Sequence, residues 1–255
     1  IAEKEVGKEV ECLKSHLDKE TACGLIQHHN YCGNLEPAKE IGEAVHQAGA
    51  KFIMSVNPIS LGILKTPAEY GADVAVGEGQ PLGLPLAFGG PYLGFMAATG
   101  AMMRKLPGRI VGQTKDRNGK TGYVLTLQAR EQHIRREKAS SNICSNQALC
   151  ALAVGFYLTA MGNEGLERAA SSCLSKAHCF AKRLGEACFE LENRGGFFHE
   201  FVTVSEKESG RALQALEEHG ILGGLPLDDH RILWCCTEMN TKEEMDEAVR
   251  ILKEV

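Results

Sequence analysis

The segment from Gly77 to Tyr92 holds the densest set of residues that could do chemistry. It contains Gly77-Glu78-Gly79-Gln80-Pro81-Leu82-Gly83 and, further on, Phe88-Gly89-Gly90-Pro91-Tyr92. So many Gly and Pro residues exclude the interior of a helix or a sheet. We therefore expect a shaped backbone surface that approaches a ligand or another chain closely.

Glu78 is the only acid of this segment and Tyr92 its only phenol. Glu78 is a candidate general acid or base; the alternative is a loop carboxylate that accepts hydrogen bonds from backbone N–H groups. The segment has no Gly-Lys-Ser/Thr, and its glycines do not open a helix, so neither a Walker motif nor a dinucleotide fingerprint is present. A backbone nest for phosphate stays open as a generic reading.

Two further polar groups follow or connect predicted elements. His28-His29-Asn30 come directly after the first predicted strand, at the usual ligand side of a parallel sheet. Adjacent histidines on a turn point in different directions, so we expect no shared metal there, and exposed turn residues are the alternative. Arg135 and Arg136 belong to a charged run that either forms a solvated connector or lines a domain cleft.

The elements that position these residues alternate between helix and strand in the first half of the chain. Helices are predicted over 3–19 and 37–48, and apolar strands over 23–27, 51–56 and 73–76. This alternation favours parallel pairing through crossover units in an α/β sheet. A strand over 93–97 follows, and Asn118-Gly119 predicts a hairpin between 109–114 and 123–127.

The second half of the chain has a different order of predicted elements. An apolar helix over 146–161 is expected to stop at Gly162, and a second helix covers 164–193. Strands over 198–204 and 231–237 alternate with a helix over 206–219, and Thr241 begins a capping box for the last helix. We expect one domain over 1–162 and a connecting helix with a small α+β domain over 163–255.

Composition narrows the function classes. The 255 residues carry a net charge of −5, which gives no basic footprint for nucleic acid. No apolar run approaches the roughly 20 residues that span a bilayer, so no membrane partner is expected. The ten cysteines contain no C-x-x-C pair. Their scatter predicts reduced, mostly buried thiols of a cytosolic protein and no zinc site.

Several multi-residue blocks, in order, resemble the P-protein family of the glycine cleavage system, and specifically its subunit 1, found where bacteria and archaea split the P-protein into two chains. The blocks are the two Gly-rich segments above, Pro107-Gly-Arg-Ile-Val-Gly, Val124-Leu-Thr-Leu-Gln, Arg130-Glu-Gln-His-Ile-Arg-Arg-Glu-Lys-Ala and Ser141-Asn-Ile-Cys. Subunit 1 is longer at its N-terminus, so the resemblance implies an N-terminally truncated fragment.

The resemblance implies an aspartate-aminotransferase-like fold (pyridoxal-phosphate fold type I) with a partial large domain and a small α+β C-terminal domain. It implies an oxidoreductase of glycine catabolism that uses pyridoxal phosphate. The reaction is decarboxylation of glycine and transfer of the aminomethyl group to the lipoyl arm of H-protein. A bacterial or archaeal cytoplasmic location goes with it.

The fold type requires a lysine after the third strand and an acid after the second. No lysine occurs between Lys65 and Lys105; Gln80-Pro81 stands near the lysine position and Val56-Asn57 near that of the acid. Lys138, in the charged connector, is the rival lysine. We therefore expect subunit 2 to bind most of the cofactor, and this chain to complete a heterodimer while inactive alone.

The resemblance also suggests roles for single residues. Gly89, Gly90 and Tyr92 are expected at the partner's cofactor phosphate, because small residues and backbone N–H groups suit phosphate. Glu78, Gln80 and Asn30 are expected to line a pocket, with Arg135 and Arg136 for a carboxylate or the acidic carrier protein. Two alternatives stay open: a self-sufficient pyridoxal-phosphate lyase or transferase, and a non-catalytic scaffold subunit.

Overall fold

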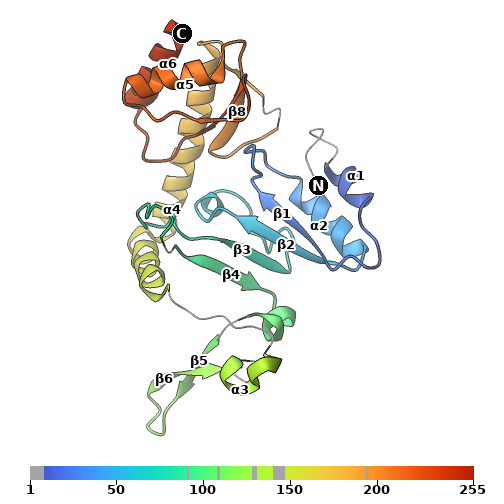
Figure 1. Ribbon diagram of the computed structural model, residues 1–255. Coiled ribbons are helices and arrows are strands. Elements are labelled where there is room, and N and C mark those ends of the chain that lie inside the picture. The colour runs from blue at the N-terminus through green and yellow to red at the C-terminus, as the bar shows by residue number, and fades with distance from the viewer. Residues whose placement is uncertain (1–8, 91, 108–109, 128–130, 140–146, 193–194) are drawn as a thin grey trace.

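The computed structural model describes residues 9–90, 92–107, 110–127, 131–139, 147–192 and 195–255. Within these ranges the strands form two four-stranded sheets and one two-stranded hairpin. Figure 1 shows the two larger sheets one above the other along a long bent helix, with the hairpin apart from both.

The first sheet has the strand order β1-β2-β3-β4. Its members are β1 (Cys23–His28), β2 (Lys51–Val56), β3 (Val74–Glu78) and β4 (Gly94–Ala98). The first three run parallel, as predicted, and β4 returns antiparallel to β3. Helix α2 (Ala38–Gln47) makes the crossover from β1 to β2, whereas only the short 3-10 turn η1 (Ser60–Gly62) lies between β2 and β3.

One face of this sheet is packed by α2. Its buried residues Ile41 and Val45 join Phe52 and Met54 of β2 in one apolar core. Helix α1 (Glu9–Lys14) packs on α2. The first part of the helix predicted over 3–19 lies outside the described residues, and its predicted end is wrong because α1 stops at Lys14. Leu17 nevertheless packs against the same core from the following turn.

Helix α4 (Ala148–Gly185) links the two halves of the molecule and bends at Gly162. Gly162 has φ 60° and ψ −172°, a conformation that is essentially restricted to glycine. The predicted stop at Gly162 is thus a bend, and the predicted continuation to residue 193 is wrong. The chain leaves the helix after Gly185 because Phe189 turns inward and is buried in the small domain.

The small domain has a second sheet, ordered β7-β8-β10-β9 and antiparallel throughout. The predicted strands are β8 (Glu200–Val204) and β10 (Arg231–Cys235), with α5 (Ser209–Glu218) between them. The edge strands β7 (Glu190–Leu191) and β9 (Leu225–Pro226) are too short for a periodic signal. The capping box predicted at Thr241 is confirmed at the start of α6 (Lys242–Glu254).

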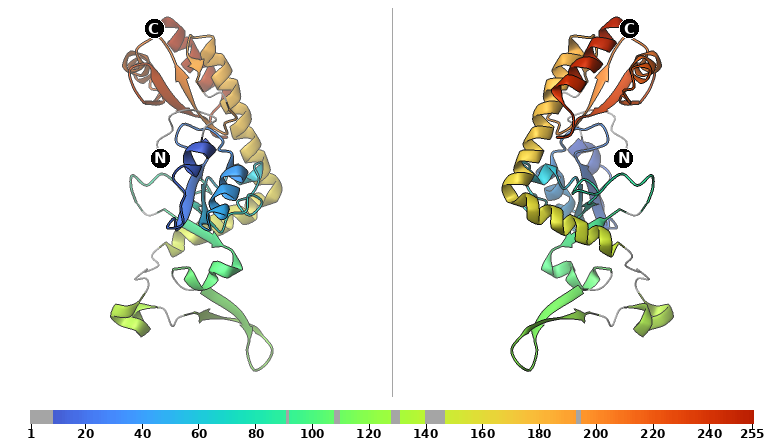
Figure 2. Two further views of the ribbon diagram at one scale, coloured as in Figure 1. Left: turned by 90° about the vertical axis from the view of Figure 1, so that its right-hand side faces the viewer. Right: turned by 90° about the vertical axis from the view of Figure 1, so that its left-hand side faces the viewer.

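The Asn118-Gly119 hairpin is confirmed as β5 (Ile110–Lys115) and β6 (Thr121–Thr126). It extends away from the first sheet, beyond the 3-10 helix η2 (Gly100–Lys105) (Figure 2). The short helix α3 (Gln132–Arg135) and the turn η4 (Arg136–Lys138) follow it.

The structure tests the expectation that most cysteines are buried. Among the described cysteines all are free, but only Cys173 and Cys236 are buried, so the expectation of mostly buried thiols is wrong.

Within the described residues α4 is the one helix long and apolar enough to cross a membrane by length and composition. Its straight apolar part before Gly162 is shorter than the roughly 20 residues that a spanning helix needs.

Candidate functional site

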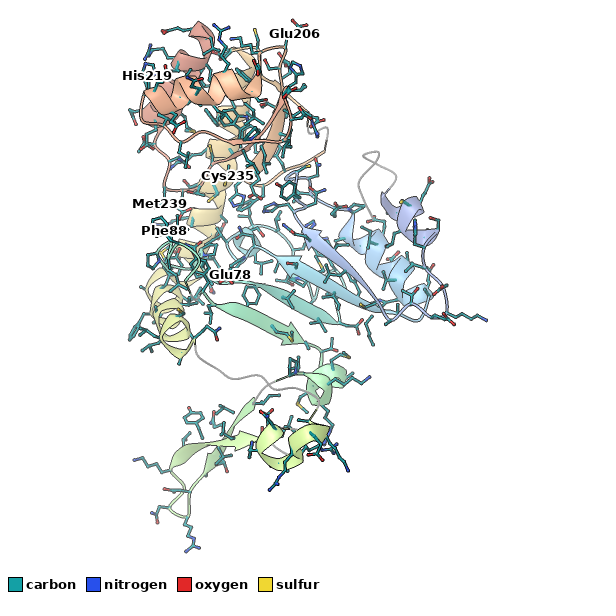
Figure 3. The ribbon with its side chains drawn as sticks, in the orientation of Figure 1. Glu78, Phe88, Glu206, His219, Cys235 and Met239 are labelled. Atoms are coloured by element: carbon teal, nitrogen blue, oxygen red, sulfur yellow. The ribbon has the colours of Figure 1, made fainter. Side chains whose placement is uncertain are left out.

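The carboxyl ends of β1, β2 and β3 lie side by side, because His28 pairs with Val56 and Ser55 with Val76 in a parallel register. The segments 29–36, 57–63 and 79–90 therefore leave the sheet at one edge. This is the edge at which open α/β sheets place their ligands. Figure 3 shows Glu78 and Phe88 there, close to α4.

Glu78 holds the Gly-rich loop together. It is the last residue of β3, and its Oε1 accepts hydrogen bonds from the backbone N–H of Gln80 at 3.1 Å and of Leu93 at 2.7 Å. The side chain of Gln80 donates to the Leu84 carbonyl at 2.7 Å. Both polar side chains are thus engaged by the loop, which matches the alternative reading of Glu78 as a loop carboxylate.

The tip of the loop faces solvent. Tyr92 Oη accepts a hydrogen bond from the Ala87 N–H at 3.0 Å, while Gly89 has φ +86° and open space beside it. Leu86 is 76% exposed and Phe88 fully exposed. Pro91, named with this loop, lies outside the described residues. The loop therefore presents apolar side chains and backbone outward.

Asn30 organises the turn after β1. Its Oδ1 accepts from the N–H groups of Cys32 and Asn34, both at 3.0 Å, and its Nδ2 donates to Glu36 at 2.7 Å. An amide that closes its own turn in this way is an Asx-type arrangement. These hydrogen bonds of the Asn30 side chain stabilise the turn that follows β1.

Arg135 and Arg136 are exposed and lie in α3 and η4. That segment lies below the first sheet in Figure 1, away from Glu78 (Figures 1 and 3). Within this chain the structure does not bring the two arginines together with the Gly-rich loop.

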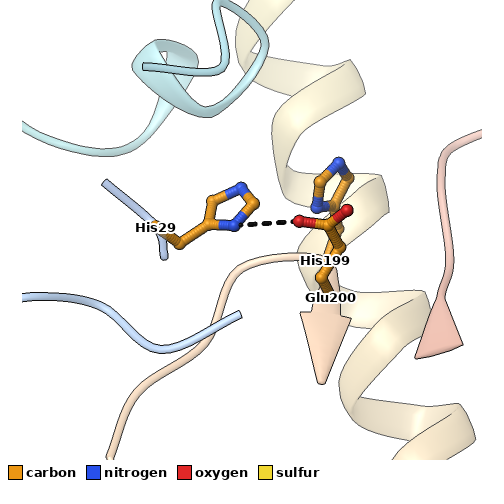
Figure 4. A group of neighbouring side chains, drawn as sticks. All are labelled: His29, His199 and Glu200. Carbon is orange, nitrogen blue, oxygen red and sulfur yellow. Dashed lines mark ion pairs between the residues drawn. The ribbon is translucent and has the colours of Figure 1, made fainter. Parts of the chain in front are cut away.

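A second group of polar side chains lies where the first sheet meets the small domain. His29 follows β1, and His199 and Glu200 stand at the start of β8. His29 Nδ1 is 3.2 Å from Glu200 Oε2, and the rings of His29 and His199 are 5.0 Å apart edge to face (Figure 4). Both histidines are buried, and the Glu200 side chain is 31% exposed.

Burial and close contacts shift the pKa values of His199 and Glu200. Desolvation lowers the pKa of His199 to about 4 against the opposing effect of the Glu200 charge, so the His199 ring is neutral at pH 7. Burial alone would raise the pKa of Glu200, but the contact with His29 and the proximity of His199 lower it overall. Desolvation likewise lowers the pKa of His28 to about 4; its ring packs against Tyr70 instead.

No local sequence pattern joins His199 and Glu200 to His29, since about 170 residues separate them. Asn57 also belongs to this junction, although the sequence drew attention to it only because an acid was expected near its position. Its Nδ2 is 3.3 Å from His199 Nε2, and its Oδ1 accepts from the Ile59 N–H at 2.9 Å. A His-Glu pair opening a predicted strand is the one sequence signal that could have drawn attention to the region.

Solved structures of low sequence identity share the fold of this chain. A mutant of C-DES with glycine covalently linked to its PLP cofactor is 17% identical with a TM-score of 0.66. It matches 97% of this chain and 64% of its own chain. An alanine–glyoxylate aminotransferase from Nostoc is 18% identical with a TM-score of 0.63, matching 98% of this chain and 65% of its own. These likenesses establish the predicted α/β, aminotransferase-like fold.

The family follows from closer matches. The family model "Glycine cleavage system P-protein" matches residues 2–252, so the chain belongs to the P-protein family. It is 52% identical to the probable glycine dehydrogenase (decarboxylating) subunit 1 of Desulfitobacterium hafniense over 96% of the chain and 56% of that relative. The corresponding protein of Moorella thermoacetica is 50% identical over 96% of the chain and 57% of that relative.

A crystal structure of glycine decarboxylase (P-protein) in inhibitor-bound form is 42% identical, with a TM-score of 0.88, over 93% of this chain and 55% of that one. The chain thus spans about half the length of the curated relatives it matches. The predicted family and its subunit 1 type are confirmed.

Proposed function

We propose that this chain serves as subunit 1 of a two-subunit glycine decarboxylase and is active only after it assembles with subunit 2. The complex decarboxylates glycine and passes the aminomethyl group to the lipoyl arm of H-protein in the cytoplasm. The proposal rests on family membership and on the makeup of the sheet edge described above.

The observation that carries the proposal is the missing amine after β3. The strand leads into Gly79-Gln80-Pro81, and no lysine occurs between Lys65 and Lys105. A pyridoxal-phosphate site needs a lysine for its internal Schiff base. Lys138, the rival, is exposed in η4, and that segment lies on the far side of the first sheet from the small domain (Figure 1).

The end of β2 is equally unsuited to the cofactor. Asn57 stands there, and its amide is already engaged by Ile59 and His199. An amide carries no negative charge to hold a protonated pyridine nitrogen. The residues of this edge therefore do not fit a self-contained pyridoxal-phosphate site, and we assign the lysine, the acid and most cofactor contacts to subunit 2.

In this proposal the Gly-rich loop is the contribution of this chain. Gly89, Gly90 and Tyr92 approach the phosphate of the partner's cofactor, and exposed Leu86 and Phe88 pack against the partner. Arg135 and Arg136 meet a carboxylate or an acidic surface of the carrier protein from a separate part of the molecule. The polar bonds of Glu78 and Gln80 keep the loop in shape for this contact.

A titration tests the proposal. The purified chain is mixed with pyridoxal phosphate, with and without subunit 2, and aldimine absorbance is followed. We expect absorbance only with both subunits, and borohydride reduction should fix the cofactor to a peptide of subunit 2. Aldimine formation by the isolated chain, abolished by Lys138→Ala, would instead establish a self-sufficient enzyme.

A scaffold role is the second candidate, favoured by the fact that the Tyr92 hydroxyl already accepts a bond within its own loop. Tyr92→Phe separates the two functions, because it removes the hydroxyl and keeps the ring. Under the leading proposal turnover per assembled complex falls. A pure scaffold predicts unchanged turnover per complex and, at most, weaker assembly.

A further inference from the structure

A cluster of metal-ligating side chains stands at the junction of the first sheet and the small domain. His29, His199 and Glu200 each offer one ligand atom, and these atoms all lie within 4.8 Å of one another. We propose that the three residues form a binding site for a transition-metal ion of the Zn²⁺ type. This site is separate from the Gly-rich loop and does not depend on subunit 2.

The geometry suits a shared ion better than a direct pair. Ligand bonds of about 2.0 Å in a tetrahedral site place neighbouring ligand atoms about 3.3 Å apart. His29 Nδ1 and Glu200 Oε2 are 3.2 Å apart, yet His29 Nδ1 has no partner aligned as a hydrogen bond. Their separation is close to that expected of two ligand atoms of one tetrahedral ion.

The cluster also holds unsatisfied nitrogen atoms. Both ring nitrogens of His29 and Nδ1 of His199 are buried without a hydrogen-bond partner. Buried polar atoms without partners are rare in folded proteins and call for a ligand or a water molecule. A cation would satisfy one nitrogen of each ring.

The donor set indicates the kind of ion. Two imidazoles and one carboxylate suit Zn²⁺, Co²⁺ or Fe²⁺, whereas Mg²⁺ and Ca²⁺ prefer oxygen ligands alone. Three protein ligands leave a fourth position for water. Glu200 also lines a cavity of about 350 Å³ in the small domain.

Asn57 controls the affinity of the proposed site. Because its Oδ1 accepts from the Ile59 N–H, its NH₂ group faces His199 Nε2. That contact favours the His199 tautomer with its proton on Nδ1, the nitrogen that the metal needs. Metal binding must move this proton to Nε2, so a carboxylate at position 57 should strengthen binding by accepting from Nε2–H.

The test uses the full chain and Zn²⁺ or Co²⁺ alone. We expect one ion per chain by equilibrium dialysis. X-ray absorption should show nitrogen and oxygen neighbours at about 2.0–2.1 Å and no sulfur at about 2.3 Å. Asn57→Asp should tighten binding by roughly 10- to 100-fold.

Three variants provide the contrast. His29→Gln and Glu200→Gln should each weaken binding by roughly 10- to 100-fold or more, with circular dichroism used to verify folding. His219→Gln removes an exposed histidine at the end of α5 that lies outside the cluster and should leave binding unchanged. Sulfur ligation, no stoichiometric ion, or unchanged binding in folded His29→Gln, Glu200→Gln and Asn57→Asp would each overturn the proposal.

Discussion

At the scale of single residues, Asp73 is the most connected acid of the first sheet. Its carboxylate accepts from Lys51 Nζ at 2.8 Å, from the Phe52 N–H at 3.0 Å and contacts His46 Nε2 at 2.9 Å. Burial alone would raise the pKa of Asp73, but these contacts outweigh it and lower the pKa to about 2. The group ties the starts of β2 and β3 to the end of α2, opposite the candidate site.

Asp73→Asn should destabilise the chain by roughly 1–3 kcal/mol at pH 7, because the buried Phe52 N–H and the half-exposed Lys51 and His46 side chains lose a charged acceptor. The carboxylate contributes fully above its unfolded pKa near 3.9, and the contribution is lost as pH falls toward the folded pKa of about 2. The difference between wild type and variant in urea denaturation should therefore shrink by roughly 1 kcal/mol at pH 3.

The exposed Asp229→Asn variant is the control, and its stability should stay within about 0.5 kcal/mol of wild type at each pH. A difference between wild type and Asp73→Asn that stays constant from pH 7 to pH 3 would contradict the assignment.

Some side-chain contacts of the candidate site were predictable from the sequence and others were not. The loop carboxylate reading of Glu78 needed only the abundance of backbone N–H groups around it, and the structure bears it out. The meeting of His29 with His199 needed the packing of two distant segments. Such contacts leave no periodic trace in a sequence, so local patterns do not predict them.

At the scale of elements, the bend in α4 sets the course of the chain between the two sheets. Its first half packs Tyr157 against Gly83 of the Gly-rich loop, and its second half packs Leu166 against Gly62 of η1. Added side-chain atoms at either glycine would meet the helix at less than 3 Å. The angle at Gly162 lets one helix contact both places.

Gly162→Ala should destabilise the chain by roughly 1–3 kcal/mol, because its φ and ψ are costly for any side chain. Gly155→Ala is the matched control in the same helix, where an added methyl group meets nothing within 4 Å. That control should raise stability by up to about 1 kcal/mol. Denaturation curves that shift equally for both variants would show that the bend is not needed.

Element types and most boundaries were predictable because periodicity, turn residues and capping are local. β2 has its predicted bounds of Lys51–Val56, and the Thr241 capping box lies where the sequence placed it. The end of α4 was not predictable in this way. Its Ala- and Cys-rich tail carries no stop signal before Gly185, and burial of Phe189 decides where the chain turns.

At the scale of the whole molecule, apolar side chains remain uncovered in places that a folded chain usually avoids. Leu149, Leu152 and Phe156 form one exposed stripe on the first half of α4, at 78%, 56% and 67%. Val111 and Tyr123 are exposed on the hairpin. Contiguous exposed apolar surface is typical of interaction sites, which agrees with the proposed assembly with subunit 2.

Leu152→Lys combined with Phe156→Lys should therefore weaken assembly with subunit 2 by at least tenfold, which corresponds to about 1.4 kcal/mol. Because both side chains are exposed, the stability of the isolated chain should change by no more than about 0.5 kcal/mol per site. Binding is measured by analytical ultracentrifugation of the two subunits. Glu167→Lys, beyond the bend, is the control, and equal loss in both variants would argue against this stripe as the contact.

Helix α4 also has a role in folding that its position as a connector does not suggest. Its residues Ala169 and Ala170 belong to the core at η1, and its residues Phe180 and Leu184 belong to the core of the small domain. Both cores therefore pack against the same continuous stretch of helix. If this stretch unfolds, apolar side chains of both cores become exposed. We therefore expect that the carboxyl-terminal half does not fold independently, and that the unfolding of the two halves is thermodynamically coupled through helix α4.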